Sequence, residues 1–89
     1  MKVVINSAYG GFSLPSDFCA TYGYEKYDEL DRRDERLIDF IEQFGENNRF
    51  GDLKIVHVPG EATDWMIMDY DGAESVIYVT NGTMKWAWD

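Results

Sequence analysis

The dipeptide Asn81-Gly82 separates two segments, at 75–80 and 83–88, whose residues are typical of β-strands. Asn-Gly suits the two-residue type I′ turn of a β-hairpin, because both turn positions need a positive φ angle. Such a turn fixes the register, so we expect Thr80 to lie opposite Thr83. The pairs further from the turn are then Val79 with Met84, Tyr78 with Lys85, and Ile77 with Trp86. We expect the core to receive the apolar face of this hairpin, which consists of Ile77, Val79, Met84 and Trp86.

Three further segments are predicted to be strands, because they are rich in β-branched and aromatic residues and are bounded by turn residues. The first covers residues 2–6. The second covers 53–58 and ends at Pro59-Gly60. The third covers 65–69 and precedes the turn dipeptide Asp71-Gly72.

Two segments have helical features. The dipeptide Gly10-Gly11 predicts a bend, after which a short helix is expected to start within 13–17 and to end at Gly23. A second helix is expected at about 34–44 and is expected to end at Gly45. Its apolar stripe consists of Leu37, Ile38, Ile41 and Phe44.

The resulting order of elements, β-α-α-β-β-β-β, predicts an α+β domain. We expect a mainly antiparallel sheet of about five strands, covered on one face by two helices. A chain of 89 residues has room for one domain, which we place at residues 1–89.

Acidic residues dominate the charge, with 17 Asp and Glu against 8 Lys and Arg, and the net charge is −9. Nucleic acid and anionic lipid repel such a domain, so we expect it to bind neither of them directly. A basic protein surface would attract it. The alternative is that the acidity only keeps a small protein soluble.

No apolar run approaches the length of a membrane span, and we expect a cytoplasmic protein.

Few residues suit catalysis. Cys19 and His57 could in principle act as nucleophile and base, but Cys19 is expected on the buried side of its helix and His57 within a strand. We therefore predict no catalytic residues, no cofactor and no metal site. The segment Asp69-x-Asp71-Gly72-x-Glu74 indicates a tight turn, with a weak cation site as the alternative.

Two groups of acids are candidates for contact with a basic partner. On the second helix, Glu35, Asp39 and Glu42 are spaced so that they lie in one line, opposite the apolar stripe. The segment 61–74 contains five acids and no Lys or Arg. Each group is therefore strongly acidic over a short distance.

Met66 and Met68 alternate with Trp65 and Ile67 along their predicted strand. If Trp65 and Ile67 face the core, the methionines project from the other face, where their adaptable side chains would suit a partner. If a helix covers that face too, the methionines belong to the core. The residues predicted to bind a partner are Glu35, Asp39, Glu42, Met66, Met68, Asp69, Asp71 and Glu74.

Four sequence motifs are distinctive: KVVIN at 2–6, YGGFSL at 9–14, DW at 64–65 and DYDGAESV at 69–76. Together they resemble a family of small uncharacterised proteins found in phages, prophages and bacteria. The resemblance spans most of the chain, but the family supplies no established activity or catalytic residues. Where the resemblance leads us to expect acidic residues, this chain has Met66 and Met68.

The phage setting implies a function by analogy. Small acidic phage proteins, anti-CRISPR proteins among them, block host nucleic-acid enzymes by occupying basic grooves. The resemblance thus implies a non-enzymatic inhibitor in the cytoplasm of a bacterial host, which imitates nucleic acid and binds a basic nucleic-acid-binding effector. The alternative is a small accessory or structural module that forms a homodimer through an apolar strand.

Overall fold

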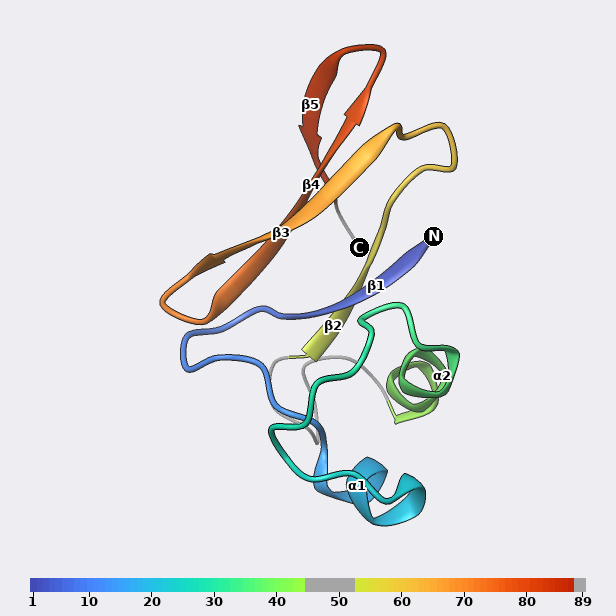
Figure 1. Cartoon of the computed structure of the whole chain (residues 1–89), viewed down its shortest axis with the longest axis vertical. Helices are drawn as coiled ribbons and strands as arrows, with labels where there is room; N and C mark the ends of the chain where they lie inside the picture. Colours follow the sequence, from blue (N-terminus) through green and yellow to red (C-terminus); the bar gives the residue numbers. More distant parts are fainter. Residues whose placement is uncertain (45–52, 88–89) are drawn as a thin grey trace.

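The computed structural model describes residues 1–44 and 53–87. Within these two ranges, two helices and five strands follow one another in the order β-α-α-β-β-β-β, which confirms the predicted α+β class and order (Figure 1). The elements are β1 (Lys2–Asn6), α1 (Ser16–Tyr22), α2 (Glu35–Phe44), β2 (Leu53–His57), β3 (Asp64–Tyr70), β4 (Ala73–Thr80) and β5 (Thr83–Trp86). The strands divide between two sheets, β1-β2 and β3-β4-β5, in which every neighbouring pair is antiparallel.

The β1-β2 sheet is the middle layer of the molecule. Successive side chains of a strand point to opposite faces, so the run Val3, Val4 and Ile5 places apolar side chains on both faces of β1. Val4 packs with Ile55 against the helices, whereas Val3 and Ile5 pack with Val56 against the β3-β4-β5 sheet. Burial on both faces explains why β1 is apolar at consecutive positions. The helices cover one face of a sheet, as predicted, and a second sheet covers the other (Figure 1).

The helical layer is organised around the fully buried ring of Phe18 in α1. The ring of Phe40 in α2 meets it edge-on, at 5.7 Å between centroids. Helix α1 ends at Gly23 as predicted, with a φ angle of 79° and an N–H that donates to the Cys19 carbonyl. Helix α2 begins after Asp34, whose carboxylate accepts the N–H of Arg36 at 2.9 Å and caps the helix. The expected helix stop at Gly45 lies outside the described residues.

The β4-β5 hairpin has the predicted register. Thr80 lies opposite Thr83, and the next pairs out to Ile77 with Trp86 follow as expected. Asn81 and Gly82 have φ angles of 51° and 75°, which a type I′ turn requires. The predicted strand over 83–88 ends at Trp86, and Trp88 lies outside the described residues.

The predicted core face of this hairpin is wrong for Met84 and Trp86, although Ile77 on that face is buried, at 8% exposed. Met84 and Trp86 are exposed to solvent, whereas Val76 and Thr80 of β4 are buried. The reason is that Val76 and Tyr78 lie on the face that packs against the β1-β2 sheet. Alternation along the strand then directs the other face outward.

Candidate protein-binding surface

A set of apolar side chains lies on the side of the β3-β4-β5 sheet that faces away from β1 and β2. Met66 lies opposite Ile77, and Ile77 lies opposite Trp86, so these side chains form one row across the sheet. The next row contains Val79 and Met84. We call this surface the outer sheet face, and its members are Met66, Met68, Tyr70, Ile77, Val79, Met84 and Trp86.

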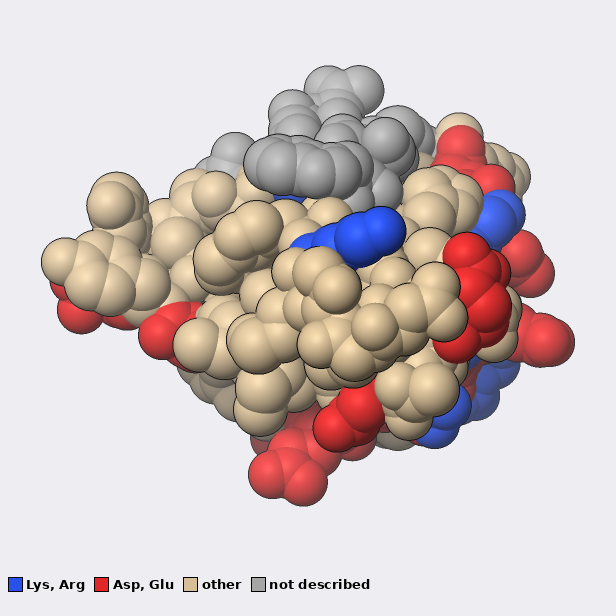
Figure 2. Space-filling view, turned by 90° about the horizontal axis from the view of Figure 1, so that it is seen from above, with Lys and Arg blue, Asp and Glu red and all other residues tan. Residues whose placement is uncertain are grey.

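Most of the outer sheet face is open to solvent. The exposed fractions are 53% for Met66, 43% for Met68, 72% for Tyr70, 65% for Met84 and 52% for Trp86. Figure 2 shows the whole molecule from the β4-β5 end: this end is mostly uncharged at its centre, apart from one short basic stretch, and acidic side chains gather toward its edges. An exposed group of large apolar side chains with a polar rim marks an interaction site.

Met66 and Met68 belong to the surface and not to the core. Trp65 and Ile67 pack into the cluster around Val76, so the methionines point away from it. The described parts of both helices pack on the far side of the β1-β2 sheet. Within residues 1–44 and 53–87, no helix covers the methionines, and they belong to the surface.

Asp69 and Asp71 lie at one end of this sheet and are exposed. Asp71 and Gly72 have φ angles of 51° and 86°, so they form the predicted tight turn. The Asp69 carboxylate accepts the N–H of Gly72 at 2.8 Å and fixes the turn. In the described ranges, no group of three or more His, Cys, Asp or Glu side chains is arranged to hold a metal ion.

Glu74 is not part of the outer sheet face, although we predicted it as a partner-binding residue. Its side chain is only 6% exposed and lies on the inner side of β4. Arg32 donates to both carboxylate oxygens, at 2.6 and 3.0 Å, and the N–H of Asn6 donates to Oε1 at 2.9 Å. Glu74 therefore connects β4 to the end of β1 and cannot reach a partner.

The segments 9–14 and 69–76, which carry the resemblance to phage proteins, lie side by side. The N–H of Gly10 donates to the Asp71 carbonyl at 3.1 Å. The side chain of Asn6 donates to the Gly72 carbonyl at 2.9 Å. A Cβ atom at residue 72 would collide with the backbone of Gly11. These contacts explain the motifs by packing, with no need for a ligand.

The acids of α2 lie in a different layer from the outer sheet face (Figure 1). Glu35, Asp39 and Glu42 are exposed beside a surface hollow of about 350 Å³, which Lys2 and Arg33 also line. Lys2 Nζ lies 2.9 Å from Glu42. The acids of α2 thus lie near the basic side chains of Lys2 and Arg33, and they do not lie together with Met66 or Met68.

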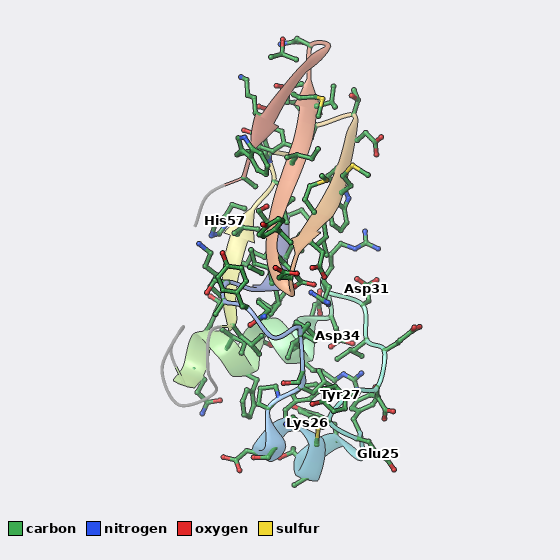
Figure 3. The ribbon with its side chains drawn as sticks, turned by 90° about the vertical axis from the view of Figure 1, so that its left-hand side faces the viewer. Glu25, Lys26, Tyr27, Asp31, Asp34 and His57 are labelled. Atoms are coloured by element: carbon green, nitrogen blue, oxygen red, sulfur yellow. The ribbon has the colours of Figure 1, made fainter. Side chains whose placement is uncertain are left out.

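Cys19 and His57 are not brought together as a catalytic pair. Cys19 packs against the cluster around Phe18, and burial raises the pKa of its thiol, with a further contribution from Asp28. A raised pKa keeps the thiol protonated and weakly nucleophilic. Figure 3 places His57 on β2, away from α1. The labelled residues Glu25 to Tyr27 lie near α1, far from the β4-β5 hairpin (Figure 3).

Comparison with known protein families, curated proteins and solved structures finds no match. The resemblance to phage proteins therefore stays a prediction. In the part of the chain that the structure describes, no helix is long and apolar enough to cross a membrane.

Proposed function

We propose that this protein is a non-enzymatic binding protein that docks on a basic protein through the outer sheet face. The observation that carries the proposal is the row of Met66, Ile77 and Trp86, in which Met66 and Trp86 stand exposed to solvent. A few aromatic and apolar anchors supply most of the binding energy in protein interfaces. Methionine side chains adapt to irregular partner surfaces, which suits Met66 as such an anchor.

The charge around the outer sheet face favours a basic partner. Glu61 and Asp64 lie near one end of β3, Asp69 and Asp71 lie near the other, and all of them are exposed. The strands of this sheet contain a single base, Lys85. A chain with a net charge of −9 attracts a basic surface from a distance, which speeds association and makes it sensitive to salt.

The partner that we propose is a nucleic-acid-handling protein of the host cell. Such proteins carry basic patches that hold the phosphate backbone. An acidic domain in that position would exclude nucleic acid and inhibit its partner, in the manner of an anti-CRISPR protein. The competing hypothesis is a homodimer through the same face. Two copies with a charge of −9 each would repel one another, which favours the basic partner.

Affinity capture from a nuclease-treated bacterial lysate tests the proposal. The baits are the wild type, the double variant Met66→Gln with Trp86→Gln, and Tyr27→Ser. Tyr27 is an exposed aromatic residue in the connection between the helices, so Tyr27→Ser is the matched control. We expect the wild type and Tyr27→Ser to retain a basic nucleic-acid-binding protein that the double variant loses.

The captured protein is then purified, and its binding is measured with charge variants. Asp69→Asn with Asp71→Asn, and Glu35→Gln with Asp39→Asn, each remove the same charge, the first pair beside the outer sheet face and the second on α2. We expect the first pair to weaken binding more, and wild-type affinity to fall by about tenfold or more between about 50 and 300 mM salt. Affinity independent of salt would contradict the proposal. A homodimer that dissociates in the Met66→Gln, Trp86→Gln variant would favour self-association.

A further inference from the structure

β5 is an edge strand with little cover from the rest of the molecule. The order of strands in its sheet is β3-β4-β5, so β5 has one neighbouring strand among the residues that the structure describes. All of its residues, Thr83 to Trp86, are exposed. The turn end of the β4-β5 hairpin projects beyond the other elements (Figures 1 and 3). An exposed edge strand is a template for pairing with another chain.

The direction of the backbone groups follows from the register. In a two-residue hairpin, the pair next to the turn exchanges hydrogen bonds, and every second pair after it does so as well. Thr83, Lys85 and Ala87 are therefore the residues bonded to β4, and the N–H of Ala87 does donate to the Val76 carbonyl at 2.8 Å. The N–H and C=O groups of Met84 and Trp86 consequently point outward from the sheet edge.

The opposite edge of the sheet is less suited to pairing. On β3, the N–H of Trp65 already donates to the Asp64 carboxylate at 2.8 Å. The guanidinium of Arg33 lies 5.8 Å from the Trp65 ring and occupies the neighbourhood of that strand. Charged groups of this kind protect an edge strand from further pairing. β5 carries no carboxylate, and the side chain of its one charged residue, Lys85, lies on the opposite face of the sheet from Met84 and Trp86.

A second copy of the chain is a poor occupant of the β5 edge. If two β5 strands paired antiparallel through Met84 and Trp86, the side chains of Lys85 from both copies would lie directly opposite each other. Like charges in that position destabilise a sheet. The net charge of −9 on each copy adds to the repulsion.

We propose that the basic partner adds an extended segment to the β5 edge, with Lys or Arg at alternate positions. Its backbone would bond the outward groups of Met84 and Trp86, as in other complexes formed by strand addition. Alternate side chains of this segment would lie on the outer sheet face, where a cation can rest on the exposed indole of Trp86. Asp64 shares that face, in the same row as Met84. This inference rests on the proposed function and specifies how the partner binds.

A peptide of alternating lysine and valine, with blocked ends, tests the inference without the natural partner. NMR amide exchange of the full chain is measured with this peptide and with a glutamate-valine peptide of equal length. We expect the lysine-valine peptide to slow exchange at the Met84 and Trp86 amides by about tenfold or more, and the glutamate-valine peptide to leave it unchanged. The Lys85 amide, already bonded to β4, serves as the internal reference.

Backbone and side-chain effects are separated by Met84→Pro and Met84→Ala. Proline removes the outward N–H but keeps the bonds to β4, because Met84 is not bonded to that strand. We expect Met84→Pro to weaken peptide binding by about fivefold or more, and Met84→Ala by less than about twofold. NMR spectra should show that the β4-β5 hairpin stays folded in both variants. Equal binding of the two peptides, binding without amide protection, or no binding at about 1 mM peptide would overturn the inference. The lysate capture would still decide the proposed function, because it does not depend on how the partner binds.

Discussion

Arg32 and Glu74 form a bidentate ion pair, with Nη1–Oε1 at 2.6 Å and Nη2–Oε2 at 3.0 Å. The N–H of Val4 donates to the Arg32 carbonyl at 2.8 Å, and the guanidinium lies 3.5 Å from the centroid of the Phe12 ring. Both partners are mostly shielded from water, with exposed side-chain fractions of 21% and 6%. This pair joins β1, β4 and the connection that precedes α2.

Glu74→Ala is expected to lower the free energy of unfolding by about 3 kcal/mol, because it leaves the Arg32 charge unpaired in a poorly solvated position. Urea unfolding followed by circular dichroism measures the change. Arg32→Ala is the reciprocal variant, and the double variant should cost less than the sum of the single ones. Strictly additive effects would show that the two side chains do not interact.

Gly72→Ala is expected to destabilise the protein by about 2 kcal/mol or more, because the new Cβ atom would collide with the Gly11 backbone. Gly82→Ala is the matched control, since Gly82 also has a positive φ angle but has open space around it. We expect the control to cost about 1 kcal/mol. Thermal unfolding of both variants checks the difference. Equal losses of stability would remove the packing explanation for the adjoining segments 9–14 and 69–76.

Asp34 gives stability a defined dependence on pH. The hydrogen bond from the Arg36 side chain holds the pKa of Asp34 below its usual value, with further help from the N–H groups that it caps. A pKa that is lower in the folded state means that the unfolded state binds more protons, so this contribution is complete above the unfolded pKa and is lost as pH falls through the folded one.

Asp34→Asn keeps a capping oxygen but cannot titrate. We therefore expect its unfolding free energy to fall less steeply than that of the wild type below about pH 4. Asp34→Ala removes the cap as well and should cost about 1 kcal/mol at neutral pH. Urea unfolding at a series of pH values measures both effects. Parallel pH profiles for wild type and Asp34→Asn would contradict this contribution.

The sequence predicted the hairpin register correctly because turn chemistry is local. It did not predict which face of the hairpin is buried, because both faces offer apolar residues: Val76 and Tyr78 on one, Ile77 and Trp86 on the other. Burial was decided by the contact of Val76 with the β1-β2 sheet, which lies far away in the chain. The ion pair of Glu74 was likewise invisible, because its partner Arg32 is 42 positions distant.

One sequence signal could have identified Trp86 as a surface residue. If Met66 points outward and pairs with Ile77, then Ile77 and its partner Trp86 must point outward as well. The register between β3 and β4 makes this link, and the short Asp71-Gly72 turn fixes that register. Combining both hairpins would have joined the methionines to Trp86 in one surface.

Side chains of the outer sheet face are expected to affect binding without affecting stability. Met66→Gln should change the free energy of unfolding by less than about 0.5 kcal/mol, because its side chain is exposed in the free protein. Val76→Ala, on the inner face of the same sheet, should cost about 1–3 kcal/mol because it leaves a cavity among fully buried neighbours. Chemical unfolding of both variants, with partner capture measured in parallel, checks the contrast. If Met66→Gln were as destabilising as Val76→Ala, the outer sheet face would be part of the core. A loss of partner binding by Met66→Gln would then reflect unfolding.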